Sequence, residues 1–96
     1  MSCYFIAQIN IHDEDEYLKY LEQSDEVFDK FKGEVVAVDD AVSILEGEWP
    51  YERTVLIRFP DKKELECWYH SEGYQKIAQH RWNASKANIV AVQGRA

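Results

Sequence analysis

The order in which strand-like and helix-like patterns follow one another is the feature of this sequence that most limits its possible folds. Apolar residues at helical spacing predict helical segments after the first and the third of four strand-like segments. Alternating or β-branched residues place those strands at Tyr4–Ile11, Glu34–Val38, Arg53–Phe59 and Asn88–Gln93. The sequence therefore predicts a β-α-β-β-α-β chain of the α+β class. Its 96 residues leave room for a single domain, 1–96.

Residues that cap helices mark the ends of the predicted helices. Asp13, Asp61 and Ser71 fit helix N-caps, and a glutamate follows each aspartate at the third position, as in a capping box. Gly33 is expected to end the first helix in a left-handed conformation. The last helical segment is expected from Gly73 to about Trp82.

The segment between the second and third strands allows two interpretations. Val42–Glu46 is β-branched, so it either continues the second strand past Asp39 and Asp40 or forms a short strand of its own. Glycine and proline within Gly47–Glu52 predict a loop before the third strand.

One face of the predicted sheet has no helix to cover it. The two helical regions can cover only one face of a four-stranded antiparallel sheet. The other face is expected to hold Ile6, Leu56 and either Val90 or Val92. An apolar surface of that size usually marks an interface. Pairing of two sheets about a two-fold axis, which forms a homodimer, would bury it.

The charge balance argues against two classes of partner. Eighteen acidic and eleven basic residues give a net charge of −7. This charge repels phosphate backbones and anionic lipid, so neither nucleic acid nor a membrane is expected as a partner. No signal peptide pattern and no apolar stretch near the roughly 20 residues of a membrane span is found, so we expect a cytoplasmic location.

The sequence also lacks the usual patterns of metal and cofactor sites. Cys3 and Cys67 are too few and too far apart for a disulfide framework or a zinc site. His12 precedes four acids at Asp13–Glu16, but the loop glycine and distal glutamate of a calcium loop are missing. With no glycine-rich phosphate loop either, no metal and no cofactor is expected.

Several local strings resemble a known family. They are Glu46-Gly47-Glu48-Trp49-Pro50, Phe59-Pro60, Trp68-Tyr69-His70-Ser71-Glu72-Gly73-Tyr74-Gln75 and Arg81. From about Tyr4 to Gly94 the chain resembles the domain of unknown function numbered thirteen-thirty, in the dimeric α/β-barrel superfamily. The resemblance implies a ferredoxin-like subunit whose sheet packs against that of its twin, with a cavity between sheet and helices. It implies no activity, because the family has no established reaction. The wider superfamily ranges from cofactor-free monooxygenases to haem-degrading enzymes, so the fold does not indicate a function.

The most suggestive side chains for chemistry are Glu46, Trp49, Arg53, His80 and Arg81. An arginine at a cavity rim can hold a carboxylate by two parallel hydrogen bonds, and Glu46 or His80 could then carry a proton. The structural interpretation is that Glu46 pairs with an arginine to pin its loop, Trp49 caps the sheet and His80 faces solvent.

Aromatic residues offer a possible cavity wall. Tyr4 and Tyr74 are candidates for contact with a substrate, because a phenol hydroxyl can sit at a cavity surface. Aromatic residues at this spacing more often belong to the core, and Trp68 is assigned there.

Two functions remain open from the sequence. In the first, a homodimer binds a small organic acid or aromatic ligand and transforms it without a cofactor. In the second, the protein is a non-catalytic binding, regulatory or structural dimer module. The sequence does not decide whether it is an enzyme.

Overall fold

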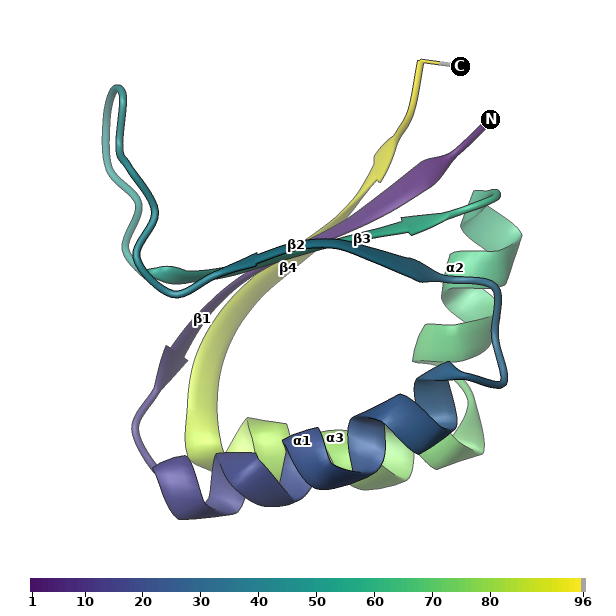
Figure 1. Cartoon of the computed structure of the whole chain (residues 1–96), viewed down its shortest axis with the longest axis horizontal. Helices are drawn as coiled ribbons and strands as arrows, with labels where there is room; N and C mark the ends of the chain where they lie inside the picture. Colours follow the sequence, from purple (N-terminus) through teal and green to yellow (C-terminus); the bar gives the residue numbers. More distant parts are fainter. Residues whose placement is uncertain (96) are drawn as a thin grey trace.

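A computed structural model describes residues 1–95 of the chain and confirms the predicted order of elements (Figure 1). The second helical region consists of two helices, which meet at His70 and Ser71. The elements are β1 (Cys3–Ile11), α1 (Glu14–Phe28), β2 (Glu34–Asp39), β3 (Arg53–Phe59), α2 (Lys62–Tyr69), α3 (Glu72–Ala84) and β4 (Ser85–Gln93).

The four strands form one antiparallel sheet in the order β2-β3-β1-β4, and the helices lie on one side of it (Figure 1). The central strand β1 pairs with both β3 and β4, so that Ile6 stands opposite Leu56 on one side and Val90 on the other. This is the α+β, ferredoxin-like arrangement that the sequence predicts.

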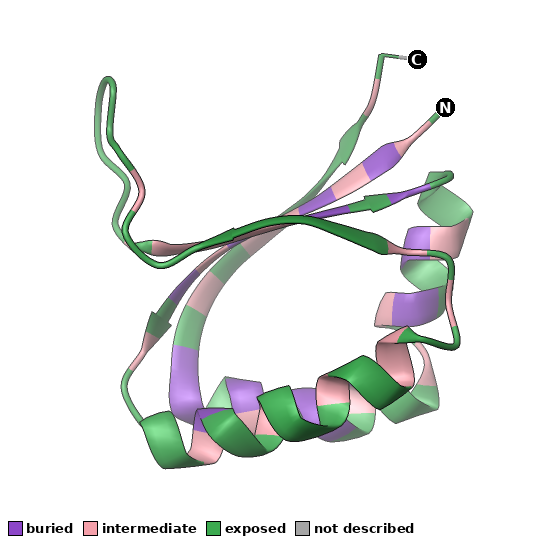
Figure 2. Cartoon of the chain, in the orientation of Figure 1, coloured by how far each residue is buried: buried purple, intermediate pink, exposed green. Residues whose placement is uncertain are grey.

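The core lies between the helices and the face of the sheet that they cover (Figure 2). Every second residue of β1 is buried there, from Cys3 to Ile9. Trp68 of α2 is at the centre of an aromatic cluster, with its ring centroid 5.1 Å from that of Phe5 and 5.4 Å from that of Phe59. The alternation in β1 therefore fixes which face of the sheet becomes the core.

The predicted helix starts are confirmed in detail. The side chains of Asp13 and Asp61 accept hydrogen bonds from the amide three residues on, at 3.1 and 2.8 Å, and Ser71 accepts one from Tyr74 at 3.1 Å. The first capping box is only half formed. The amide of Asp13 donates to the carbonyl of Ala84, and the Glu16 carboxylate contacts His80 instead.

The prediction for Gly33 is wrong. Helix α1 ends at Phe28 with Asp29 as its C-cap, and Gly33 follows several residues later without a positive φ. A Cβ atom at Gly33 would come within 2.6 Å of the Phe28 ring and 2.8 Å of the Phe59 ring. Glycine is required here by close packing, not by a left-handed conformation.

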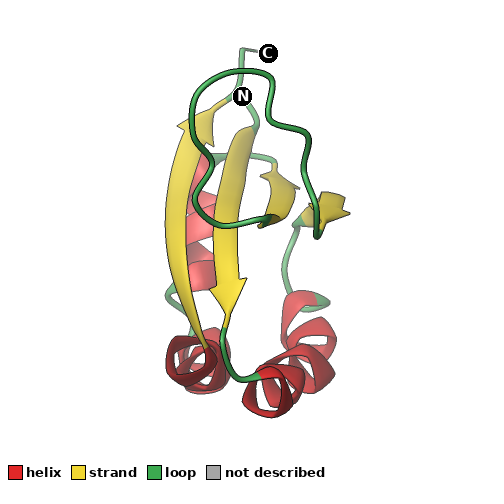
Figure 3. Cartoon of the chain, turned by 90° about the vertical axis from the view of Figure 1, so that its left-hand side faces the viewer, coloured by secondary structure: helices red, strands yellow, loops and turns green. Residues whose placement is uncertain are grey.

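Two other boundaries differ from the sequence prediction. Val42–Glu46 is not a strand, because the chain leaves the sheet after Asp39 and forms a loop (Figure 3). Strand β4 begins at Ser85, three residues before the predicted start, because α3 runs directly into it. The Ser85 hydroxyl marks this junction by donating to the Arg81 carbonyl at 2.7 Å.

The helix-free face of the sheet carries a group of apolar residues, and both candidate valines belong to it. Val90 and Val92 alternate with residues of the other face and are 56% and 42% exposed. They pair with Ile6 and Tyr4 of β1. The strand register therefore assembles a continuous apolar strip that the helices do not cover.

Two glycine-to-alanine substitutions should change stability in opposite directions. Gly33→Ala should lower the free energy of unfolding by about 1–3 kcal/mol, because its methyl group would meet two core rings. At Gly73, inside α3, the nearest atoms are 3.6 Å away, so Gly73→Ala should raise it by about 0.4–1 kcal/mol. Urea denaturation of both variants measures the difference. A Gly33→Ala variant as stable as wild type would contradict the close packing.

Candidate functional site

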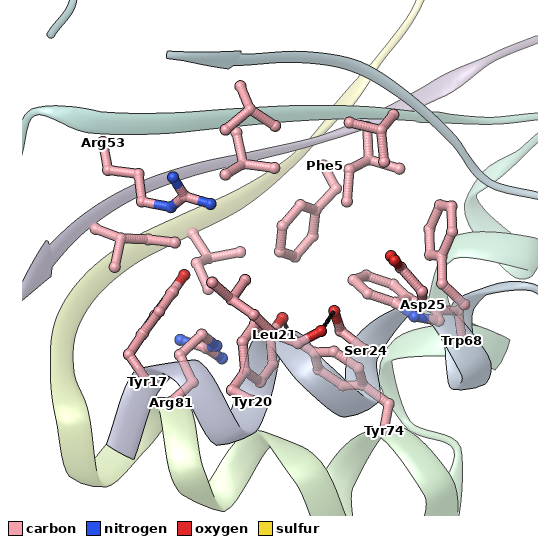
Figure 4. Close-up of a pocket in the computed structure, with 17 residues that line it drawn as sticks. Phe5, Tyr17, Tyr20, Leu21, Ser24, Asp25, Arg53, Trp68, Tyr74 and Arg81 are labelled. Carbon is pink, nitrogen blue, oxygen red and sulfur yellow. Dashed lines mark hydrogen bonds between the residues drawn. The ribbon is translucent and has the colours of Figure 1, made fainter. Parts of the chain in front are cut away.

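A cavity of about 250 Å³ lies between the sheet and the helices (Figure 4). Its wall is mainly apolar and aromatic, with two arginines among the residues that line it. These residues are Phe5, Ile9, Tyr17, Tyr20, Leu21, Ser24, Asp25, Phe28, Val35, Val38, Arg53, Val55, Ile57, Trp68, Tyr74, Arg81 and Ile89. Leu21 of α1 and Val35 and Val38 of β2 are substantially exposed, so the cavity opens between these two elements.

Arg81 is the most unusual residue of the cavity. It is only 3% exposed, and its Nε and Nη2 atoms have no hydrogen-bond partner among residues 1–95. Its guanidinium carbon lies 5.9 Å from the centre of the Tyr20 ring. No carboxylate in the described part of the chain lies within ion-pair distance of it. A buried charge in this state costs several kcal/mol unless a counter-ion is supplied.

The sequence places Arg81 inside because it shares one face of α3 with apolar residues. Tyr74, Ile77, Ala78 and Ala84, at helical spacing from Arg81, are all buried. Burial by itself lowers the pKa of Arg81. The neighbouring hydroxyls of Tyr74 and Tyr20 have the opposite effect and outweigh it, so the pKa of Arg81 lies above its ordinary value. The guanidinium therefore stays charged inside the protein.

Arg53 supplies a second guanidinium from the first residue of β3. Its Nη1 atom donates to Asp40 at 2.6 Å, whereas its Nε atom is buried without a partner among residues 1–95. The group lies 5.8 Å from the centre of the Tyr17 ring. Arg53 thus joins the cavity wall to the loop that follows β2.

Two tyrosine hydroxyls meet in the cavity wall. The hydroxyl oxygens of Tyr20 in α1 and Tyr74 in α3 lie 2.8 Å apart and share a hydrogen bond. Burial raises the pKa of Tyr20 well above its usual value, and the nearby Tyr74 adds to this. Burial also raises the pKa of Tyr74. Both phenols keep their protons at neutral pH, and only one proton is used in the bond between them, so the other can be donated.

The polar groups of the cavity are therefore mostly donors. Unpaired N–H groups come from Arg53 and Arg81, and one O–H comes from the tyrosine pair. Asp25, an exposed residue of α1, is the one carboxylate among the described lining residues. The arrangement suits a ligand that accepts hydrogen bonds and carries negative charge.

The structure brings three of the predicted site residues together in this cavity. Arg53, Tyr74 and Arg81 line it. Tyr4 does not, because its neighbours Cys3 and Phe5 face the core and it therefore points to the helix-free face.

The remaining predicted residues lie outside the cavity. Glu46 and Trp49 belong to the loop between β2 and β3, where the Trp49 indole donates to the Thr54 hydroxyl at 3.0 Å. His80 faces α1, with its Nδ1 atom 2.5 Å from the Glu16 carboxylate. Hydrogen bonds to His80 and Lys19 lower the pKa of Glu16. Neither Glu46 nor His80 is among the residues that line the cavity.

Sequence reasoning missed the contribution of α1 to the cavity. Tyr17, Tyr20, Leu21 and Ser24 line it from one face of that helix. Their spacing of three and four residues was the available signal, but such spacing is shared by ordinary core residues.

Residues 1–95 contain neither a metal-binding cluster nor a membrane-spanning helix. No group of three or more His, Cys, Asp or Glu side chains in this range could hold a metal ion. No helix of the same range is long and apolar enough to cross a bilayer.

The chain belongs to a family without an assigned activity. The model of the family described as "Domain of unknown function (DUF1330)" matches residues 2–95. No curated protein matches the sequence.

Solved structures with the same fold share little sequence with this chain. A protein of unknown function from Rhodopseudomonas palustris, RPA0582, has a TM-score of 0.79 at 14% identity, over 99% of this chain and 83% of that one. The cofactor-independent oxygenase SnoaB from Streptomyces nogalater has a TM-score of 0.69 at 11% identity, over 99% and 94%. A dimeric ferredoxin-like protein of unknown function from Jannaschia sp. CCS1 also has a TM-score of 0.69 at 11% identity, over 98% and 100%. These matches establish the ferredoxin-like fold.

The tyrosine pair predicts a specific loss of stability at alkaline pH. An unfolded tyrosine ionises near pH 10, whereas Tyr20 in the folded chain keeps its proton to a higher pH. Its contribution is therefore fully present below about pH 10 and is lost as the pH rises through the folded pKa, by up to about 1.4 kcal/mol per pH unit. Urea denaturation between about pH 9 and about pH 11, a range around the ionisation of an unfolded tyrosine, should show a flatter pH dependence for Tyr20→Phe than for wild type. Identical slopes would show that Tyr20 ionises normally.

Proposed function

We propose that this protein binds a small organic acid in the cavity between sheet and helices, with Arg81 holding the acid group. The observation that carries the proposal is the state of Arg81, which is buried at 3% exposure with Nε and Nη2 both unpaired within residues 1–95. A bound anion would supply the missing counter-ion.

The unpaired atoms of Arg81 favour a carboxylate in particular. Nε and Nη2 lie on the same edge of the planar guanidinium group, so their N–H bonds point in parallel. The two oxygens of a carboxylate accept such a pair of hydrogen bonds side by side. The unpaired Nε of Arg53 and the free proton of the Tyr20–Tyr74 pair can bind a further oxygen of the ligand.

The rest of the cavity favours an apolar or aromatic skeleton. Phe5, Trp68 and Leu21 line it, and the ring faces of Tyr17 and Tyr20 are already covered by the two arginines. A flat, partly apolar acid would gain contact with these walls and place its charged end between the arginines.

Binding without turnover is the form of the proposal that the cavity supports best. Among its described lining residues there is no histidine or cysteine, and Asp25 is an exposed carboxylate on α1. A reaction that needs a base inside the cavity would have to use Asp25. Cofactor-free transformation of the ligand is the alternative, and chromatography of a bound acid after prolonged incubation with the protein would reveal it.

We also propose that two copies pair through the helix-free face of the sheet. Val90, Val92, Ile6 and Leu56 make this face apolar. Its charged residues are balanced in a protein of net charge −7, with two acids and two bases at Glu34, Asp39, Arg58 and Lys86. A second copy would therefore meet little repulsion here, in contrast to the acidic surface of α1.

Arg81→Met should abolish the preference for acids over neutral analogues. Isothermal titration would compare three carboxylates, phenylacetate, benzoate and hexanoate, each with its amide. For wild type, at least one acid should bind at least about tenfold more tightly than its amide, because charge-assisted hydrogen bonds contribute about 1.5–3 kcal/mol each. In Arg81→Met, each acid and its amide should bind with the same affinity.

The control for this substitution is Arg95→Met, which changes an exposed arginine and should leave the preference intact. Arg81→Met should itself be as stable as wild type or more so, since it removes a buried unpaired charge. The binding proposal fails if no acid in the panel binds more tightly than its amide.

Val90→Lys should dissociate the proposed dimer. It places a charge within the apolar strip, next to Ile6, whereas Leu18→Lys makes the same change at a residue of α1 that is 51% exposed. Sedimentation velocity should show dimers for wild type and for Leu18→Lys, and monomers for Val90→Lys. A wild-type protein that remains monomeric at every concentration would rule out the dimer.

A further inference from the structure

The segment from Asp40 to Glu52, which we call the arm, has apolar side chains that nothing in the described chain covers. It rises from the sheet on the side away from the helices (Figure 1). Leu45 near its tip is 92% exposed, Ile44 is 56% exposed and Trp49 is 36% exposed. The arm also contains the string Glu46-Gly47-Glu48-Trp49-Pro50, which the cavity does not use.

The arm is held in a defined direction by contacts at its base. Asp40 pairs with Arg53, and the amide of Ala41 donates to the Asp39 carboxylate at 2.9 Å. On the returning side, the Trp49 indole donates to Thr54 of β3. Gly47 has a φ of 76°, a left-handed conformation that glycine adopts without strain, and this allows the chain to turn back. These contacts set the direction in which the arm leaves the sheet.

We infer that the arm packs against a second copy of this chain bound on the helix-free face, so that the partner covers Ile44, Leu45 and the exposed part of Trp49. This inference rests on the dimer proposed above and extends its interface beyond the sheet. Because the arm and the apolar strip lie on the same side of the sheet, a partner seated on the strip would lie beside the arm (Figure 1).

The size of the sheet supports a contribution from the arm. The four strands contain 31 residues. With about 3.3 Å per residue and about 4.8 Å between strands, their flat footprint is roughly 500 Å². A standard interface takes about 800 Å² of accessible surface from each partner, a quantity that is larger than the flat footprint of the same contact because side chains stand out from the sheet. An additional apolar element next to the strip would enlarge the contact toward that size.

The charge of the arm distinguishes a protein partner from a membrane or nucleic acid. It carries Asp40, Glu46, Glu48 and Glu52, and no lysine or arginine lies between Asp40 and Glu52. Anionic lipid and phosphate backbones would be repelled by these acids. A second copy offers the apolar, charge-balanced face already described.

The test compares the double variant Ile44→Ser/Leu45→Ser with a control that changes an exposed leucine elsewhere, Leu18→Ser on α1. Sedimentation velocity over a range of concentrations gives the dimer dissociation constant. The double variant should raise it at least about tenfold, because two aliphatic side chains lose their cover. Leu18→Ser should leave it unchanged.

Fluorescence of Trp49 gives a second readout that does not depend on the folding of the variant. In a Trp82→Phe background, the remaining tryptophans are Trp49 and the buried Trp68. Dilution through the dissociation constant should shift the emission to longer wavelength as Trp49 loses its cover.

The outcomes separate the inference from the dimer on which it rests. In one outcome, wild type dimerises and Val90→Lys does not, which supports the dimer. If in the same experiments the arm variant dimerises like wild type and the Trp49 emission stays constant on dilution, the arm inference is wrong. If wild type never dimerises, both are wrong. A raised dissociation constant with an emission shift supports both.

Discussion

The guanidinium of Arg81 is the group around which the other features of the cavity are arranged. It is carried inward by the buried face of α3, and its backbone carbonyl accepts the Ser85 hydroxyl where the helix turns into β4. Aromatic residues surround it, and Tyr20 offers the face of its ring. None of these neighbours neutralises the charge. A buried guanidinium without a counter-ion lowers the stability of the empty protein, and this cost is the reason for proposing an anion as its ligand.

The second constraint is that this sheet has helices on one side only. The covered face gains its core from β1 and the Trp68 cluster, whereas the other face keeps the apolar strip around Val90. Arg53 connects the two sides, because it lines the cavity and also binds Asp40 at the base of the arm. Ligand binding and pairing of subunits would therefore share one residue.

Much of the fold could be predicted from the sequence, because period-two burial and capping residues act locally. The site was less predictable. Gly33 fits both a left-handed cap and a close approach, and only the position of the Phe59 ring decides between them. Tyr20 has the spacing of a core residue, and whether a core is filled or hollow depends on distances between elements far apart in sequence. Glu46 was expected at the cavity rim because its loop follows one strand and Arg53 opens the next. The direction of that loop is set by side-chain contacts at the base of the arm, which the sequence pattern does not show.

The most direct test of whether Arg81 holds a carboxylate is a crystal structure of the protein with phenylacetate, or with whichever acid of the panel binds best. The two carboxylate oxygens should accept hydrogen bonds from Nε and Nη2 of Arg81, with the arginine side chain in the same position as in the structure without ligand. A ligand bound elsewhere, or an Arg81 side chain turned away to pair with an acid of the protein, would contradict this prediction.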